Sequence, residues 1–176
     1  MNIFVLCTGR CGSVTFTKAC SHINNYTSGH ETRAKLAGSD RLRYPARHIE
    51  VDNRLSWFLG RLDERFGDEA FYVHLWRDPV RVAESMNRRW HLRNGIIRGY
   101  ADSICAAPVQ DPLATCMDYV GTVTANIRLF LKDKSRKMDF NLDDAATAWP
   151  TFWRGISAEG DFAAASREFS VAHNAS

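Results

Sequence analysis

The sequence predicts a three-layer α/β fold with a mostly parallel sheet. Segments typical of strands alternate with segments typical of helices along all 176 residues, and this alternation favours a parallel sheet with helices on both faces. The first strand, Ile3–Leu6, is a continuous apolar run. Such a run is typical of a strand that is buried on both sides of a sheet. A connection rich in glycine then leads from this strand into a helix.

Periodicity and turn residues place the other elements. Gly67 ends one predicted helix, and Asp78-Pro79 supplies an N-cap and a first-turn proline for another. The predicted order is a helix after residue 12, a strand at 26–28, a helix at 55–66, a strand at 71–76, a helix at 79–90, a loop or lid at 94–112, a long helix at 113–131, a strand at 138–142, and helices at 149–156 and 163–169.

Composition narrows the class of protein. Hydrophobic residues make up 45% of the chain and charged residues 24%, which is ordinary for a globular protein. We therefore expect one domain over residues 1–176. No apolar run approaches the roughly 20 residues of a membrane span. The five cysteines are odd in number and sparse, which argues against a disulfide framework and favours a cytoplasmic location.

Charge is unevenly distributed along the chain. Residues 77–98 contain six arginines against Asp78 and Glu84, whereas residues 139–176 contain six acidic residues and only two arginines. A basic middle segment suits an anionic ligand, and a nucleic-acid groove would give a similar bias. Charge alone therefore leaves both kinds of ligand open.

The connection after the first strand has the character of a phosphate-binding loop. Free N–H groups at a helix start attract anions, glycines let the backbone approach a phosphate closely, and hydroxyl groups add hydrogen bonds. Arg10 adds a fixed cation. The predicted ligands of this phosphate are Thr8, Gly9, Arg10, Cys11, Gly12, Ser13, Val14 and Thr15.

Other interpretations of this loop compete with that prediction. The glycines could simply make a tight connection. A Walker A loop requires lysine between glycine and Ser/Thr, and here Gly12 is followed directly by Ser13. A cysteine phosphatase requires arginine six positions after its cysteine. Ser13 stands six positions after Cys7, and Thr17 six after Cys11.

A second phosphate-binding site is predicted at the end of the strand at 71–76. Arg77 follows Phe71–Trp76, and Ser85 lies eight residues further on, about two turns into the next helix. A guanidinium and a hydroxyl so placed can hold one phosphate from two sides. A surface arginine and an unrelated helix serine would also explain the pair if it stood alone.

Together, the Gly-Arg-Cys-Gly-Ser loop and the Arg-Asp-Pro…Ser segment resemble the sulfotransferases that use 3′-phosphoadenosine 5′-phosphosulfate (PAPS). The resemblance implies a P-loop NTPase-like sulfotransferase fold. It also implies that the first loop binds the 5′-phosphosulfate and that Arg77 and Ser85 bind the 3′-phosphate. PAPS would be the donor, 3′-phosphoadenosine 5′-phosphate (PAP) the product, and no metal would be required. Arg10 stands where many members have lysine.

The chain also lacks the late Arg-Lys-Gly segment that some members add to the 3′-phosphate site. We therefore expect help there from Arg81 or from the C-terminal tail.

Residues 29–33, Gly-His-Glu-Thr-Arg, resemble the Gly-Glu-Glu-Thr-Arg of tyrosylprotein sulfotransferases. The resemblance implies that Glu31 is the base that takes the acceptor proton and that Arg33 assists it, with His30 in place of the first glutamate. His30 is a rival base, because an imidazole titrates near neutral pH. A structural Glu–Arg pair at a helix start is the simpler alternative.

The sequence thus predicts sulfuryl transfer from PAPS to a hydroxyl on a sugar, phenol, peptide or lipid. It predicts no nucleic-acid partner and no metal site. A nucleotide-binding module without turnover is the first alternative, and a low-molecular-weight cysteine phosphatase the second. The match over the five-residue segment 29–33 is too short to identify the acceptor.

Overall fold

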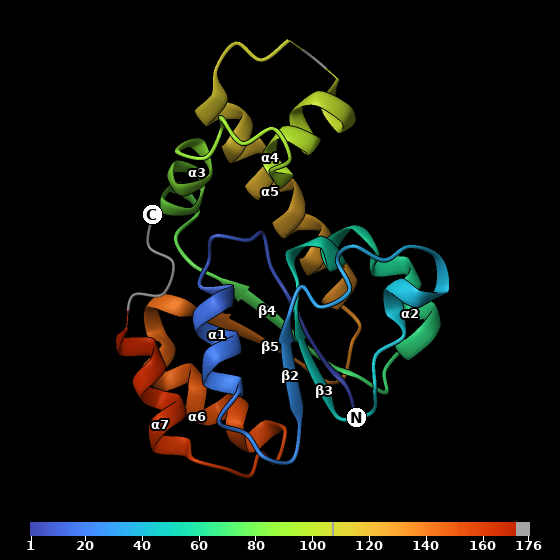
Figure 1. Ribbon diagram of the computed structural model, residues 1–176, viewed down its shortest axis with the longest axis vertical. Coiled ribbons are helices and arrows are strands. Elements are labelled where there is room, and N and C mark those ends of the chain that lie inside the picture. Colours follow the sequence, from blue (N-terminus) through green and yellow to red (C-terminus); the bar gives the residue numbers. More distant parts are fainter. Residues whose placement is uncertain (107, 172–176) are drawn as a thin grey trace.

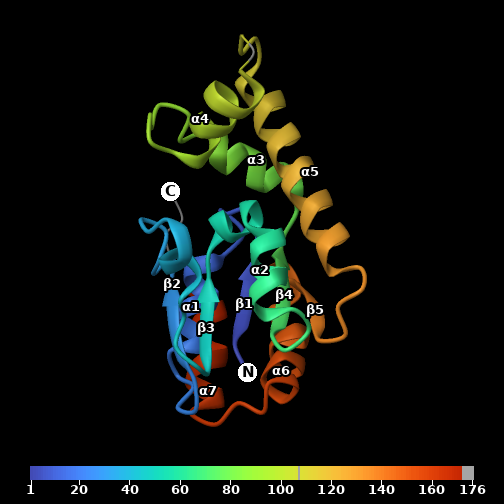
Figure 2. The same cartoon turned by 90° about the vertical axis from the view of Figure 1, so that its right-hand side faces the viewer.

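The computed structural model describes residues 1–106 and 108–171. Its centre is a five-stranded sheet in the order β2-β3-β1-β4-β5, in which every neighbouring pair is parallel (Figures 1 and 2). The prediction of an α/β fold with a parallel sheet is confirmed. The strands are β1 (Ile3–Leu6), β2 (Thr27–His30), β3 (His48–Val51), β4 (Phe71–Trp76) and β5 (Lys137–Asn141).

Aromatic side chains attach one layer of helices to the sheet, and Figure 1 shows these helices beside the strands. This layer comprises α1 (Ser13–Cys20), α6 (Ala145–Gly155) and α7 (Phe162–Arg167). Phe16 of α1 packs edge-on against Phe140 of β5, with 4.9 Å between ring centroids, and against Phe152 of α6 at 5.1 Å. The same ring contacts the buried Trp149. These contacts fix the start of α1 relative to the strands.

The opposite face of the sheet is covered by a second layer, which Figure 2 shows in front of the strands. Phe4 of β1 lies 4.6 Å from the ring of Phe66, and Tyr72 of β4 meets Phe130 edge-on at 5.1 Å. The sheet is therefore buried on both faces, as the apolar strands β1 and β4 require. This layer comprises the 3₁₀ helix η2 (Asn53–Trp57), α2 (Leu59–Phe66) and α5 (Pro112–Leu131).

Strand β3 is an element that periodicity did not predict. All four of its residues are buried, including His48 and Glu50. The His48 Nε2 atom lies 2.9 Å from Glu50 Oε2, and the Glu50 carboxylate also accepts hydrogen bonds from the backbone N–H and the hydroxyl of Thr32. Because partners distant in sequence satisfy these polar groups, a strand that looks half polar is buried completely.

The prediction of a loop at 94–112 is wrong for residues 96–105. After α3 (Pro79–Asn87), the chain forms α4 (Ile96–Gly99) and a π-helical segment, Tyr100–Cys105. Tyr100 is buried, packs edge-on against Tyr119 of α5 and donates a hydrogen bond to Asp118. Anchoring by this one aromatic residue organises a segment whose glycine and small residues suggested irregular structure. Residue 107 lies outside the described residues.

The strand order creates a crevice between β1 and β4. From β1 the chain passes through α1 to β2 at one edge of the sheet, and from β4 it passes through α3–α5 to β5 at the other edge. Neighbouring strands whose connections depart in opposite directions leave a crevice outside their carboxyl ends, where ligands bind in open α/β sheets. The topology therefore brings together the two segments that the sequence singled out.

Candidate functional site

A pocket of about 660 Å³ lies at the carboxyl ends of the strands. Segments at the ends of all five strands contribute to it, and the end of α3 and the start of α4 form a further wall. From the strands come Gly9, Arg10 and Gly12 after β1, His30 and Glu31 at the end of β2, Asn53 and Arg54 after β3, Arg77 after β4 and Leu142 after β5.

The loop between β1 and α1 has the backbone of an anion site. Gly9, Arg10 and Gly12 all have positive φ angles, 83°, 57° and 89°. A Cβ atom on Gly12 would lie 2.4 Å from the Leu142 side chain, so only glycine fits there. Helix α1 begins at the next residue without a side-chain cap. Its first-turn N–H groups, which have no acceptor within the helix, therefore remain for a ligand.

Two residues of the predicted donor loop lie outside the pocket lining. Thr8 is buried and accepts a hydrogen bond at its carbonyl oxygen from the Tyr119 hydroxyl (2.9 Å). Cys11 is fully buried among core side chains. Both residues face the core because the loop turns around Gly9 and Gly12. They hold the loop in place, while Ser13, Val14 and Thr15 line the pocket.

The cysteines of this loop are poorly suited to nucleophilic catalysis. Cys7 is fully buried, and its hydrogen bond with Cys11, together with burial, raises the pKa of the Cys7 thiol well above its usual range. A catalytic cysteine needs an accessible thiol with a lowered pKa. The same hydrogen bond lowers the pKa of Cys11, but that side chain is fully buried as well. The geometry thus argues against the phosphatase alternative.

We therefore expect no cysteine-dependent phosphatase activity. The wild type and Cys7→Ser should hydrolyse p-nitrophenyl phosphate equally slowly, at the rate of a buffer control, because neither Cys7 nor Cys11 presents an accessible thiolate in the loop. Release of p-nitrophenol at pH 6 to 8 measures this. Turnover in the wild type that Cys7→Ser abolishes would contradict the expectation.

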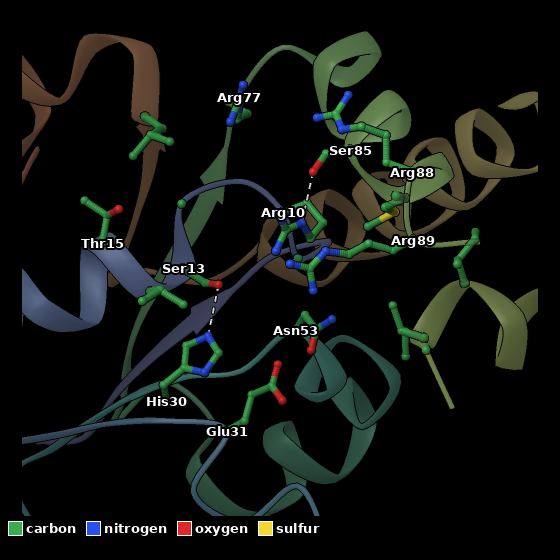
Figure 3. A pocket seen from close by; sticks show the side chains of 18 of the residues that line it. Arg10, Ser13, Thr15, His30, Glu31, Asn53, Arg77, Ser85, Arg88 and Arg89 are labelled. Carbon is green, nitrogen blue, oxygen red and sulfur yellow. Dashed lines mark hydrogen bonds between the residues drawn. The ribbon is translucent and has the colours of Figure 1, made fainter. Parts of the chain in front are cut away.

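Arg77 and Ser85 meet the donor loop at the pocket. The Arg10 Nε atom donates a hydrogen bond of 3.0 Å to Ser85 Oγ, which links the loop after β1 to helix α3 (Figure 3). Arg77 also lines the pocket. Among residues 1–106 and 108–171, its buried Nε atom has no hydrogen-bond partner. A buried donor without a partner is costly, and a phosphate oxygen would satisfy it.

The positive charge of the pocket exceeds what the motifs indicate. Burial lowers the pKa of the Arg10 guanidinium, and three neighbouring cations lower it further: Arg89, Arg88 and Arg77. Arg88 and Arg89 follow α3 and line the pocket. They occupy positions three and four after Ser85, the spacing of one helix face. That spacing is a sequence signal that Arg88 and Arg89 lie on the same side as Ser85, and sequence reasoning missed it.

Glu31 is held by a different arginine from the one the resemblance implies. Its Oε2 atom accepts a 2.5 Å hydrogen bond from Arg54, and both residues line the pocket. Arg33 lies outside the lining, donates to the Asp40 carbonyl oxygen and covers the Tyr44 ring. Glu31 has a φ of 51°, so the chain turns sharply at the end of β2 and carries Arg33 away. Strained backbone of this kind is common at functional sites.

Two further polar side chains complete this end of the pocket. His30 Nε2 lies 3.0 Å from Ser13 Oγ, so it contacts the donor loop (Figure 3). Asn53 is buried, and within the described part of the chain its Oδ1 atom has no hydrogen-bond partner. Figure 3 shows Asn53 between Glu31 and Arg89. Sequence reasoning missed Asn53 and Arg54 because it missed the strand before them.

Other predicted features lie elsewhere. Arg81 is ion-paired with Asp143 and lies outside the pocket lining, so the structure does not place it with the predicted 3′-phosphate ligands Arg77 and Ser85. Phe169 and Val171 near the C-terminus do line the pocket, and residues 172–176 lie outside the described residues. Within the described ranges, no cluster of three or more His, Cys, Asp and Glu residues could hold a metal ion. No described helix is long and apolar enough to cross a membrane.

No protein-family model and no curated protein sequence matches the chain. Among solved structures, a sulfotransferase domain from the curacin biosynthetic pathway superposes with a TM-score of 0.68, over 97% of this chain and 78% of that domain. The chain has a sulfotransferase-like fold. Sequence identity to that domain is 12%, so the likeness concerns the fold. The predicted sulfotransferase fold is thus confirmed, and the finer resemblance of residues 29–33 to tyrosylprotein sulfotransferases stays a prediction.

Proposed function

We propose that this chain is a sulfotransferase that transfers a sulfuryl group from PAPS to an acceptor hydroxyl. The observation that carries the proposal is the meeting of two anion sites in one pocket, the glycine loop at the start of α1 and the Arg77–Ser85 pair. A nucleotide with a phosphate at each end of its ribose requires two such sites. The partnerless Nε atom of Arg77 supports the second phosphate.

The donor residues divide between the two ends of the nucleotide. The backbone N–H groups at the start of α1, with the Ser13 and Thr15 hydroxyls, hold the 5′-phosphosulfate. Arg77 and Ser85 hold the 3′-phosphate. Arg10 joins both halves through its bond to Ser85 and places a cation where the leaving phosphate develops charge. No residue of this set requires a metal ion.

Glu31 is the base in this proposal. PAPS supplies the sulfuryl group, and Glu31 takes the proton of the acceptor hydroxyl at its carboxylate. Arg54 replaces Arg33 as the residue that orients this carboxylate, because Arg54 is the one that contacts it. His30 orients Ser13 in the donor loop through its ring nitrogen.

Binding of PAP tests the donor half of the proposal. We expect Arg77→Ala to weaken PAP binding about 10- to 150-fold, because each hydrogen bond to a charged group contributes about 1.5–3 kcal/mol. Binding of AMP, which has no 3′-phosphate, should change little. Arg81→Ala is the matched control, since Arg81 lies four residues after Arg77, in α3, and pairs with Asp143 outside the pocket lining. Isothermal titration calorimetry measures the affinities of the wild type and both variants for PAP and AMP.

Equal affinity of the wild type for PAP and AMP would overturn the donor assignment. The alternative of a binding module without turnover makes the same binding predictions, so it needs a separate measurement. Such a module binds PAP but transfers no labelled sulfuryl group from PAPS to any alcohol. The Glu31–Arg54 pair beside the donor loop favours the enzyme.

A further inference from the structure

One wall of the pocket differs in chemistry from the donor side. The segment from the end of α3 to the start of α4 contributes four large apolar side chains to it, Met86, Leu92, Ile96 and Ile97, beside the basic Arg88 and Arg89. Gly95 adds no polar side chain to this wall. Figure 1 shows α3 and α4 in a lobe above the strands, with α1 below that lobe. An acceptor that shares the pocket with the nucleotide can therefore lie against these four apolar side chains.

The arginines that line the pocket are opposite in charge to the proposed donor. PAPS carries about four negative charges, shared between its 3′-phosphate and its phosphosulfate. Four arginines line the pocket near one another: Arg10, Arg77, Arg88 and Arg89. The fifth, Arg54, is paired with Glu31. An acidic acceptor would add a further negative charge beside the bound donor and the Glu31 carboxylate, and the repulsion would disfavour its binding.

The polar groups at the acceptor end suit a single hydroxyl. The Oδ1 atom of Asn53 is a buried acceptor without a partner among the described residues, and it lies near Glu31 (Figure 3). One O–H group satisfies it and is then positioned for Glu31. A sugar would place several further hydroxyls against the apolar wall, where each would lose its hydrogen bonds to water.

The apolar character continues beyond the pocket. Leu92 lines the pocket and is 42% exposed. The following segment of the same lobe exposes four more large apolar residues: Ile104, Val109, Leu113 and Met117. Because Leu92 both lines the pocket and is exposed, the apolar wall reaches the pocket rim.

We propose that the acceptor is an uncharged alcohol on an extended apolar body, held by the α3–α4 wall with its hydroxyl at Asn53 and Glu31. This inference rests on the proposed sulfotransferase function and selects among its acceptor classes. An alkylphenol and a long-chain alkanol share the required chemistry. Sugars and acidic peptides lack it.

A chain-length series tests the inference. With saturating labelled PAPS, kcat/KM for 4-ethyl-, 4-butyl- and 4-hexylphenol should rise about two- to fourfold per added methylene, as expected for burial of hydrocarbon. A 4-alkylphenol that ends in a carboxylate should react about tenfold more slowly than its neutral counterpart of equal length. The matching 1-alkanols show whether the aromatic ring is needed.

Two variants test whether the α3–α4 wall binds the acceptor. Ile96→Asn should lower kcat/KM for 4-hexylphenol about tenfold without weakening PAP binding, because Ile96 lies on the acceptor side. Leu129→Asn is the control, since Leu129 is exposed on α5 outside this pocket. PAP affinity also verifies that each variant is folded.

The outcomes separate this inference from the proposed function. If the wild type binds PAP no better than AMP, the proposed function fails. If PAP binds normally but a sugar or an acidic peptide is the better acceptor, or chain length has no effect, only the acceptor inference is overturned. Absence of both transfer to, and calorimetric binding of, 4-hexylphenol by the PAP-loaded protein overturns it as well.

Discussion

Replacing Glu31 with glutamine is expected to lower kcat for sulfuryl transfer about 10²- to 10⁴-fold, the usual contribution of a positioned base. Glutamine has the same size and can still accept the hydrogen bond from Arg54, but it cannot take up the acceptor proton. PAP affinity should therefore match the wild type. Initial rates with saturating labelled PAPS, together with calorimetric titration of PAP, separate the two effects.

His30→Gln is the matched control for the choice of base. His30 contacts Ser13 in the donor loop, so its replacement should weaken PAP binding several-fold, by the value of about one hydrogen bond, with a smaller loss in kcat. If His30→Gln reduces kcat more than Glu31→Gln does, the base is His30. If neither variant changes kcat, neither residue is the base.

Replacing Arg54 and replacing Arg33, the two arginines near residues 29–33, should have different effects on the rate of sulfuryl transfer. Arg54→Ala should lower kcat, because Glu31 loses the partner that orients it. Arg33→Ala should retain the wild-type rate, because Arg33 contacts Asp40 and Tyr44 outside the pocket lining. The motif resemblance alone predicts the reverse. Rates for the two variants thus separate the geometry from the resemblance.

Both halves of the proposed donor site were predictable because each follows an apolar strand. Strands β1 and β4 are buried on both faces, so their sequences are apolar apart from His74, and their ends were visible at Leu6 and Trp76. The glycine loop and Arg77 follow those ends directly. Their convergence on one pocket depends on the order of strands in the sheet, which no local pattern encodes.

The acceptor side was predicted poorly for a physical reason. Strand β3 carries His48 and Glu50, which look like solvent-facing residues but are buried and hydrogen-bonded to Thr27 and Thr32, which are distant in sequence. Missing that strand meant missing Asn53 and Arg54 after it. The apolar α3–α4 wall was hidden similarly, because Tyr100 orders its segment through α5 rather than through helical periodicity.

Arg41→Met is expected to destabilise the fold by about 3–5 kcal/mol at pH 7, the usual cost of breaking a buried ion pair. Arg41 donates a 2.6 Å hydrogen bond to Asp52, and these side chains are only 1% and 0% exposed. Asp52 also accepts from the backbone N–H of Arg54 at the start of η2. Urea denaturation measures the loss. Arg43→Ala, which breaks an exposed pair with Asp40, should change stability by less than about 1 kcal/mol.

The loss in Arg41→Met should depend on pH with a defined sign. Burial already raises the pKa of Asp52, and Arg41 opposes that rise. Without Arg41 the folded-state pKa rises further, so the folded variant binds a proton that the unfolded chain has released. The stability of Arg41→Met relative to the wild type is therefore greatest below the pKa that Asp52 has in the unfolded chain. It falls as the pH rises through the pKa that Asp52 has in the folded variant. Urea denaturation curves from pH 4.5 to 7.5 test this. A loss of stability that does not depend on pH would mean that lost packing, rather than the uncompensated carboxylate, causes the destabilisation.

The same variant should also affect the pocket. Because Asp52 immediately precedes Asn53 and Arg54, Arg41→Met should disturb the positions of these two pocket residues while the protein is still folded.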